Sequence, residues 1–380
     1  MAMVAFWAAA ALLAQTYFLY PLWLLVLARL RPARQRAPVR PWVWPTVSLV
    51  VAAHDEAGCI GEKLRNSLAL DYPPDRLEVL IGSDGSADGT DATVQAHPDP
   101  RVQLSAAPRA GKTSVLNRCI PAARGEVVVL SDANTRIDPG AVRALVRHFD
   151  DPEVGAVCGR LQLYNPTRAE YEESAYWKYE SWLKALEGTQ GAVVGANGGL
   201  YALRRSLFTP LPPTTIVDDF VIPLRLLDQG YRVLYEPAAL ASEETTEDYG
   251  REFGRRARIA AGNFQSLGLV PGLLSPFRGF PAFAFWSHKV LRWCAPALML
   301  VALAANVALL DQPFYRFTLG AQLGFYALAA LGSLAVGPSG VRRIASAAYY
   351  FVTMNLAIVV GFWRFLRHSQ AAAWERTARV

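Results

Sequence analysis

Cysteine and charge are both scarce in this chain of 380 residues. The four cysteines stand far apart and form no CxxC or CxxH pair, which argues against a disulfide framework and against a zinc site. Charged residues make up 18% of the chain and apolar residues 52%, whereas ordinary soluble proteins are about 25% charged. Such a composition excludes a disordered chain and is unusual for a soluble one. No nucleic-acid-binding motif is present, so we expect no nucleic-acid partner.

The first 28 residues contain no Asp, Glu, Lys, Arg or His. This length is sufficient to cross a hydrocarbon core of ~30 Å, so we predict an N-terminal transmembrane helix over residues 1–28. A basic juxtamembrane linker follows over residues 29–45, with Arg29, Arg31, Arg34, Arg36 and Arg40. Because basic residues favour the cytoplasmic side, we expect a multi-pass plasma (inner) membrane protein whose following domain is cytoplasmic. The basic flanks would contact anionic membrane lipids.

Three more charge-free runs lie near the C-terminus, over Trp293–Leu310, Phe317–Val341 and Ile344–Trp363. They predict three transmembrane helices within residues 293–366, followed by a basic tail over 367–380. The aromatic, proline-interrupted stretch 271–292 is predicted to be an interfacial amphipathic segment. Four spans would leave the tail outside, although its arginines favour the inside. Either one run is re-entrant or the positive-inside rule fails here.

Short apolar runs alternate with helical stretches over residues 46–270. The predicted strands are Thr46–Ala53, Leu77–Gly82, Arg101–Ser105 and Glu126–Leu130, and the predicted helices are Ala57–Leu70, Asp88–Ala96, Thr113–Ala122 and Pro139–Phe149. This alternation predicts a Rossmann-like α/β domain with a mostly parallel sheet. Ligands of such sheets bind at the carboxyl ends of the strands.

Acidic residues follow three of these predicted strands. His54-Asp55-Glu56 comes after the first strand, Asp84 after the second, and Ser131-Asp132-Ala133-Asn134 after the fourth. A single aspartate at such a place can simply cap a helix. Several acids at one edge instead imply a cation, base edges or ribose hydroxyls. Asp132 and Asn134 offer two oxygen ligands, which suit Mg²⁺ or Mn²⁺ bridging to phosphate oxygens.

Two glycine-containing segments add candidate contacts for a phosphorylated ligand. Gly111-Lys112-Thr113 begins a helix and is similar to a P-loop, but Ala106 stands where a P-loop needs glycine. Lys112 could balance diphosphate charge or be an ordinary solvated lysine. Asn197 lies in Gly195–Gly199, a permissive loop that could bring backbone close to a ligand or form a plain turn. We count Lys112 and Asn197 among the candidate donor-binding residues.

Two further groups lie toward the end of the domain. Asp218 and Asp219 precede the helical run Ile222–Gln229, where an acid could deprotonate an incoming hydroxyl or only cap the helix. Arg255 and Arg258 fall on one helical face. They could stabilise a leaving diphosphate or form a basic stripe facing the membrane.

Taken together, these residues resemble glycosyltransferase family 2, and within it the membrane-embedded group that includes cellulose and hyaluronan synthases. The stretch VSLVVAAHDEAGCIGEKLRNSLALDYPPDRLEVLIGSDGSADGT carries the most specific part of the resemblance. The resemblance implies a GT-A-type fold, a nucleotide-diphosphate sugar donor and inversion at the anomeric carbon.

The resemblance also implies roles for individual residues. Asp84 resembles the acid that contacts the nucleoside, and His54 and Glu56 lie in the strand-one motif of the same pocket. Asp132 and Asn134 resemble the metal motif, which in this family often ends in Asp.

Near the end of the domain, Asp219 is similar to the catalytic base, with Asp218 in place of the Glu that is common before it. Arg258 resembles the Arg of the family's QxxRW motif, with Ile259 where Trp is usual. The stretch Trp374-Glu375-Arg376-Thr377 resembles a C-terminal motif of the group.

We therefore expect a membrane-bound, metal-dependent, inverting glycosyltransferase. It would move a sugar from a nucleotide-diphosphate sugar to a hydroxyl of a glycan, a growing polysaccharide or a lipid-linked acceptor. A homo-oligomer is possible, because four spans are few for a polysaccharide channel. Two alternatives stay open, a membrane P-loop-like NTPase and a non-catalytic, degenerate transferase that binds a nucleotide or a lipid.

Overall fold

The computed structural model describes residues 1–30, 43–164, 175–244, 249–334 and 339–371. Most of the predicted linker, most of the basic tail and the stretch Trp374–Thr377 lie outside the described residues. The chain divides into two compact units. The first comprises Met1–Trp23, Asp248–Phe264 and Phe285–Gln370, and the second comprises Leu24–Glu247, Gln265–Ala284 and Ala371–Val380.

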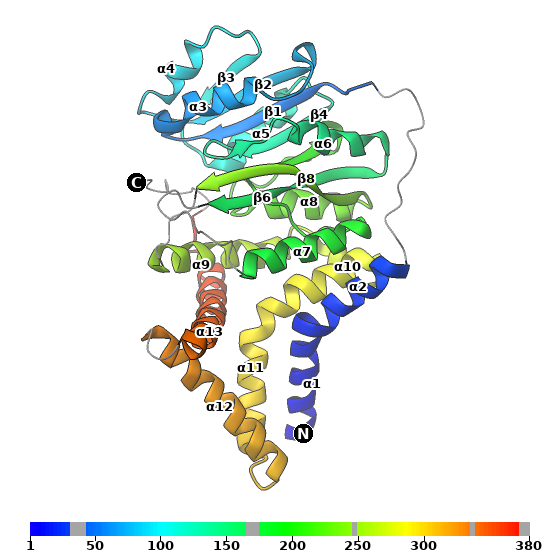
Figure 1. The fold of residues 1–380 in the computed structure, drawn as a ribbon, viewed down its shortest axis with the longest axis vertical. Coiled ribbons are helices and arrows are strands. Elements are labelled where there is room, and N and C mark those ends of the chain that lie inside the picture. Colours follow the sequence, from blue (N-terminus) through cyan, green and yellow to red (C-terminus); the bar gives the residue numbers. More distant parts are fainter. Residues whose placement is uncertain (31–42, 165–174, 245–248, 335–338, 372–380) are drawn as a thin grey trace. The chain divides into compact units, whose positions relative to one another are not determined.

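The second unit is built on an eight-stranded sheet with the order β3-β2-β1-β4-β7-β6-β8-β5 (Figure 1). The β1, β2, β3 and β4 strands pair in parallel, as do β6 and β8, whereas β7 runs antiparallel to both β4 and β6. The mostly parallel sheet was predicted, and the reversed strand β7 was not. The strands are β1 (Val47–Ala53), β2 (Leu77–Asp84), β3 (Val102–Ala107), β4 (Val127–Asp132), β5 (Arg136–Ile137), β6 (Val154–Tyr164), β7 (Tyr201–Arg204) and β8 (Arg232–Glu244).

Helices cover both faces of the sheet, so β1, β2 and β4 are buried along nearly their whole length. One continuous core joins the sheet to the helices α3 (Ala57–Leu68), α4 (Thr90–Gln95) and α6 (Ala141–Val146). The helix α5 (Lys112–Ala122) packs so closely on β2 that a Cβ added to Gly82 would lie 2.2 Å from Val115 Cγ1. The unit also contains α7 (Ala175–Thr189), α8 (Asp218–Asp228) and α10 (Phe280–Ala284).

Each strand and helix predicted between residues 46 and 149 is present, with ends shifted by a few residues. The largest change is at residues 147–150, which form a 3-10 turn after α6 instead of continuing it. Helix α8 begins earlier than predicted, so Asp218 and Asp219 are its first residues and do not precede it. Acidic side chains in a first turn interact favourably with the positive end of the helix dipole.

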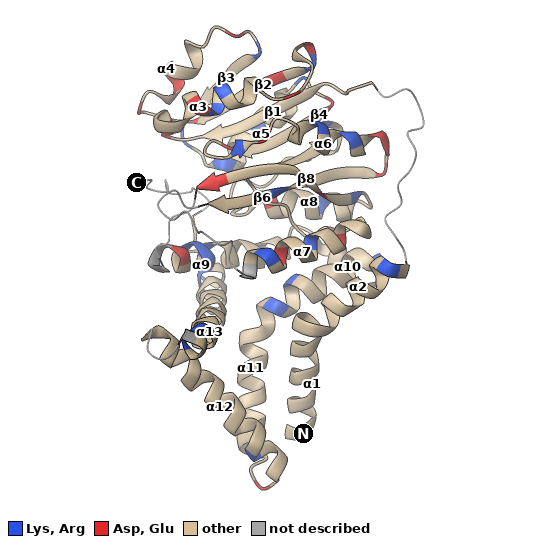
Figure 2. Cartoon of the chain, viewed as in Figure 1, with Lys and Arg blue, Asp and Glu red and all other residues tan. Residues whose placement is uncertain are grey.

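Most helices of the first unit are apolar with few charged residues, whereas α9 (Tyr249–Ser266) carries Glu252, Arg255, Arg256 and Arg258 (Figure 2). Three helical runs are long and apolar enough to cross a membrane: Ala2–Leu30, Phe280–Ala308 and Gly340–Leu366. The second begins thirteen residues before the predicted Trp293, inside the stretch predicted to be interfacial. The span predicted over Phe317–Val341 coincides with α12 and is not among the three, although part of it lies outside the described residues. The helices are α1 (Ala2–Ala14), α2 (Tyr20–Leu30), α9 (Tyr249–Ser266), α11 (Leu291–Ala308), α12 (Pro313–Ser333) and α13 (Ser339–Leu366).

Hydrogen bonds that side chains donate join several of these helices. Thr16 Oγ1 donates to the Ser287 carbonyl oxygen at 2.6 Å, in a place where two π-helical turns, Gln15–Leu19 and Phe285–Val290, meet. Thr318 Oγ1 donates to Asn306 Oδ1 at 2.7 Å and so ties α12 to α11. Polar groups inside apolar helices need such partners, since no water is available to replace them.

Candidate active site

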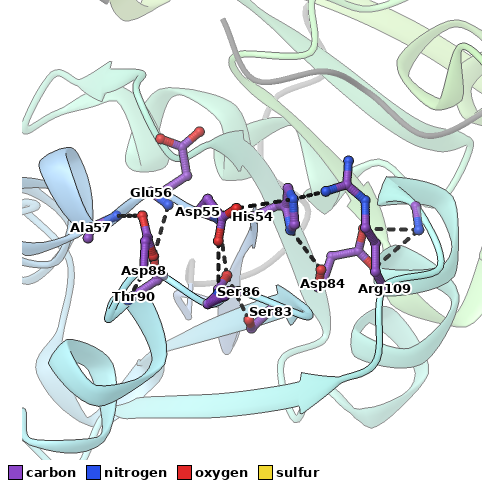
Figure 3. Close-up of polar contacts among 12 residues, drawn as sticks. His54, Asp55, Glu56, Ala57, Ser83, Asp84, Ser86, Asp88, Thr90 and Arg109 are labelled. Atoms are coloured by element: carbon purple, nitrogen blue, oxygen red, sulfur yellow. Dashed lines mark hydrogen bonds and ion pairs between the residues drawn. The ribbon is translucent and has the colours of Figure 1, made fainter. Parts of the chain in front are cut away.

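Hydrogen bonds join the loop that follows β1 to the loop that follows β2 (Figure 3). Asp55 Oδ1 accepts from the Ala87 backbone N–H at 2.8 Å, and the Glu56 N–H donates to Thr90 Oγ1 at 2.8 Å. Asp55 has a φ of 53°, a left-handed conformation that aspartate tolerates better than most residues. The first two acidic strand ends therefore meet at one edge of the sheet, as predicted.

Asp84 holds the turn that leads into α5. Its side chain is buried, and its Oδ1 accepts from the Ala110 N–H at 2.7 Å while its Oδ2 accepts from the Gly111 N–H at 3.0 Å. The next residue is Lys112, so the Asp84 carboxylate fixes the position of that lysine's backbone. The nucleoside contact of Asp84 remains a prediction, whereas its hydrogen bonds give it a structural role at this turn.

His54 connects the end of β1 to the same turn. Its Nδ1 lies 2.8 Å from the Asp84 carbonyl oxygen, and since a carbonyl only accepts, Nδ1 is the donor. The other ring nitrogen contacts the guanidinium of Arg109, a residue that the sequence reasoning missed (Figure 3). The Glu56 carboxylate accepts from Cys59 Sγ at 3.2 Å and points away from the other labelled side chains.

Lys112 lies among carboxylates. Its Nζ is 2.7 Å from Asp132 Oδ1 and 3.8 Å from Asp218 Oδ2. Burial would lower the pKa of Lys112, but Asp132, Asp218 and Asp219 outweigh burial and raise it, so the ammonium stays charged. The alternative of an ordinary solvated lysine is therefore wrong.

Two buried oxygens close to this lysine have no hydrogen-bond partner among the described residues: Asp218 Oδ2 and the Tyr201 hydroxyl. Burial raises the pKa of Asp218, and the neighbouring Asp219 and Asp132 raise it further while Lys112 lowers it. Burial, with the same three carboxylates, also raises the pKa of Tyr201, so its hydroxyl keeps its proton at neutral pH. Orphaned buried oxygens are costly, and their presence marks this end of the site as a place for a ligand.

Asp132 and Asp219 approach each other at Gly198. A Cβ added to Gly198 would lie 3.1 Å from Asp219 Oδ2 and 3.5 Å from Asp132 Oδ2. The neighbouring Ala196 N–H donates to the Asp219 carbonyl oxygen at 3.0 Å, which fixes the loop against α8. The end of β4, the start of α8 and the loop 195–199 thus meet in one place. Both carboxylates belong to residues that the sequence singled out.

Asn197 and Arg258 were also predicted as site residues. The Asn197 side chain is buried in the fold, where its Oδ1 accepts from Lys184 of α7 and its Nδ2 lies 3.4 Å from the Gly159 carbonyl oxygen. Only the backbone of this loop, at Gly198, lies beside the carboxylates. Arg258 belongs to α9 in the first unit, so its contact with a diphosphate remains a prediction.

Asp132 and Asn134 carry oxygen atoms of the type that hard divalent cations prefer as ligands. Among the described residues no group of three or more His, Cys, Asp and Glu is placed to hold a metal ion. Mg²⁺ and similar ions, however, are usually held by one or two carboxylates together with phosphates and water. Asp132 and Asn134 supply such oxygens, and Asp218 Oδ2, 3.8 Å from the Lys112 ammonium, has no hydrogen-bond partner among the described residues.

Lys63 was missed by the sequence reasoning although it holds the segment that carries Asp132. Its buried Nζ donates to Ser131 Oγ at 2.7 Å and to the Thr135 carbonyl oxygen at 2.6 Å. Burial lowers the pKa of Lys63 to about 7, against the opposing effects of Asp132, Cys59 and Glu243. The signal was its spacing, since Ile60, Lys63, Leu64 and Ser67 form the buried face of α3.

Comparisons with known proteins agree with this geometry. A sequence model of the family "Glycosyltransferase like family 2" matches residues 45–262, more than half of the chain. The "Probable glycosyltransferase YdaM" of Bacillus subtilis (strain 168) is 27% identical over 243 residues, which are 58% of this chain and 55% of that protein. The "Poly-beta-1,6-N-acetyl-D-glucosamine synthase" of Staphylococcus aureus (strain MSSA476) is 26% identical over 229 residues, with coverages of 58% and 55%. The match spans about half the length of these curated relatives.

The fold is also found in a solved structure, the mannosyltransferase PcManGT from Pyrobaculum calidifontis in complex with GDP-Man and Mn²⁺. The TM-score is 0.68 at 24% identity, over 95% of this chain and 98% of that one. This likeness confirms the GT-A-type fold with its mostly parallel sheet. The family match replaces the alternative of a P-loop-like NTPase, since Gly111-Lys112-Thr113 lies inside the matched region. The chain belongs to the glycosyltransferase-like family 2.

Proposed function

We propose that this chain is a membrane-bound, inverting glycosyltransferase that depends on a divalent cation. One observation carries the proposal: the carboxylates of Asp132 and Asp219 both lie within 3.5 Å of the position that a Cβ would take at Gly198, with the charged Lys112 beside Asp132. A donor diphosphate needs positive charge and a cation, and an acceptor hydroxyl needs a base. Lys112 and Asp132 could bind the diphosphate and its cation here, and Asp219 could act as the base.

The residues divide the work as follows. Lys112 balances the charge of the diphosphate, and Asp132 with Asn134 holds the cation, which when bound neutralises charge on the leaving group. Asp219 takes the proton from the acceptor hydroxyl as that oxygen attacks the anomeric carbon. Asp218 is buried beside Lys112 and is less suited to this task. Arg258 is assigned to the departing diphosphate by resemblance alone.

The relatives suggest the first donors to try. One curated relative is named for a polymer of N-acetylglucosamine, and PcManGT was solved with GDP-Man. We therefore propose a nucleotide-diphosphate hexose or N-acetylhexosamine as the donor. The acceptor would be a glycan or a lipid-linked hydroxyl compound.

Three spans in place of four would remove the conflict over topology. If three helical runs cross the membrane, the arginines that follow the first run lie on the same side as Arg364, in the last turn of the third run, and Arg367, just after it. The positive-inside rule then places both groups, and the catalytic domain, in the cytoplasm. Reporter fusions to the C-terminus should report a cytoplasmic location. An external C-terminus would contradict this arrangement.

Activity can be tested with the purified full-length protein in detergent or lipid. The assay combines Mn²⁺ or Mg²⁺, candidate sugar nucleotides and lipid or glycan acceptors, and it follows nucleotide release and product mass. Asp219→Asn should lower turnover by roughly 10²- to 10⁴-fold without weakening donor binding, because it removes the base and keeps the shape of the side chain.

Asp75→Asn is a matched control, because Asp75 is highly exposed, with 78% of its side chain accessible, and lies outside the site. It should leave turnover unchanged. Donor binding without any transfer, in every combination of donor and acceptor, would instead support the alternative of a degenerate, non-catalytic transferase.

A further inference from the structure

The cation motif departs from the pattern of the family it resembles, since Asn134 stands where an aspartate is frequent. The fold brings another carboxylate to that position from far along the chain. Asn134 Nδ2 donates to Glu243 Oε1 at 2.9 Å, across a sequence separation of 109 residues. The negative charge missing at residue 134 is thus present next to it.

The backbone fixes this arrangement. Glu243 belongs to β8, which pairs antiparallel with β5 through Ile137↔Ala241 and Arg136↔Ser242. Continuing that register brings residue 243 alongside the end of the loop that holds Asp132 and Asn134. Glu243 therefore reaches the loop because of strand pairing, and not through one extended side-chain conformation.

The hydrogen bond also fixes the orientation of the Asn134 amide. A carboxylate only accepts, so the amide nitrogen must face Glu243 and the amide oxygen must face away. Asn134 makes no other hydrogen bond among the described residues, and its oxygen is not buried. Asn134 thus presents an oxygen, the atom that a hard cation prefers, and keeps its nitrogen occupied.

Charge balance gives Glu243 a second use. Asp132 Oδ1 already pairs with Lys112, and the buried Lys63 contacts the same loop through Ser131. Because Lys112 already occupies one oxygen of Asp132, a second carboxylate beside this loop would add to the negative charge that a divalent cation meets. The electrostatic influence of Asp132 and of Glu243 reaches Lys63, so both carboxylates lie near this loop.

We propose that Glu243 is a positioning residue of the divalent-cation site, which orients the Asn134 amide and supplies the second negative charge. The pair Asn134 and Glu243 thus takes the place of one aspartate at position 134. This inference rests on the proposed function, because it concerns the cation that the transfer reaction uses.

The test moves the charge between the two positions in the full-length protein. The variants are E243Q, N134D and the double variant N134D/E243Q, with E244Q as a matched control on the next residue of β8, whose side chain faces the other side of the strand. The readout is Mn²⁺ binding, measured by loss of the free-ion electron paramagnetic resonance signal, with Mn²⁺ alone and with added UDP or GDP. No transfer assay is needed.

E243Q keeps a hydrogen-bond acceptor and loses the charge, so it should weaken Mn²⁺ binding by about 10- to 100-fold. N134D alone should bind no tighter than the wild type, because its new carboxylate would touch that of Glu243 and the two repel. The double variant should return close to the wild-type affinity, and E244Q should not change it.

Wild-type affinity in E243Q, or a double variant as weak as E243Q, would overturn the inference while leaving the proposed function in place. Absence of Mn²⁺ binding in the wild type, with and without nucleotide, would overturn both. Recovery in the double variant also shows that the weak binding of E243Q is not caused by misfolding.

Discussion

The two ends of the candidate site are built differently. At the end near β1 and β2, the side chains of Asp55, Asp84 and Thr90 accept hydrogen bonds from backbone N–H groups and so join the loops, and His54 links them to the turn before α5. At the end near β4 and α8, Asp218 Oδ2 and the Tyr201 hydroxyl have no hydrogen-bond partner in the part of the chain that the structure describes. The first end is a finished scaffold, whereas the second keeps unmatched charge and polarity for a ligand to satisfy.

The largest effect should come from the unmatched end. Asp132→Ala removes the carboxylate that pairs with Lys112 and is proposed to hold the cation, so turnover should fall by roughly 10²- to 10³-fold. Calorimetry with and without Mn²⁺ should show that the metal no longer strengthens donor binding. If Mn²⁺ strengthened donor binding by Asp132→Ala as much as by the wild type, the end near β4 and α8 would not be the cation-binding end.

A smaller effect should follow from crowding the same end. Gly198→Ala places a Cβ 3.1 Å from Asp219 Oδ2, so the carboxylate must shift by a few tenths of an ångström. We expect turnover to drop about tenfold to 10²-fold, because small displacements of reacting groups are costly. Gly140→Ala is the matched control, because a Cβ at Gly140 meets no atom within 4 Å, and it should leave turnover unchanged. Gly89 is less suitable because its φ is positive. Equal kinetics for Gly198→Ala and Gly140→Ala would contradict the proposed geometry.

Substitutions at the hydrogen-bonded end of the site, near β1 and β2, should lower the stability of the fold. Asp84→Ala leaves the N–H groups of Ala110 and Gly111 without their acceptor, which should reduce the free energy of unfolding by about 1–3 kcal/mol. Chemical or thermal unfolding of the purified protein measures this change. The comparison fails if Asp84→Ala abolishes donor binding in protein that is as stable as the wild type.

A pH-dependent effect concerns Lys63, which contacts the segment that carries Asp132. Its pKa falls from 10.5 to about 7 on folding, mainly through burial. Between these values the unfolded chain binds more protons than the native state, so this lysine makes stability rise as the pH increases from about 7 toward 10.5. The slope is at most about 1.4 kcal/mol per pH unit. Lys63→Met should flatten the stability profile over pH 7–9, and parallel profiles for variant and wild type would contradict the lowered pKa of this buried amine.

Local sequence signals predicted much of the sheet but not its reversal. The run Val47–Ala53 is apolar throughout, and β1 is buried throughout, so periodicity and composition sufficed there. The short β7 lies between β4 and β6 and pairs antiparallel with both. Strand order and direction of this kind have no local signature in the sequence.

The site shows the same division. Asp84, Asp132 and Asp219 were predicted because each stands at a strand or helix end that the local pattern reveals. Glu243 joins Asn134 only through the pairing of β8 with β5, which no short-range pattern encodes. Asn197 was chosen for its glycine neighbours, but its side chain bonds to Lys184 from a helix that periodicity did not place.

Anomalous X-ray diffraction at the manganese edge, on crystals of the full-length protein grown with Mn²⁺ and UDP or GDP, tests the central claim most directly. The account predicts a manganese peak in coordination contact with an Asp132 oxygen, next to Asn134 and on the Gly198 side of Lys112. A peak bound to other residues, or a nucleotide diphosphate bound away from Lys112 and Asp132, would contradict it.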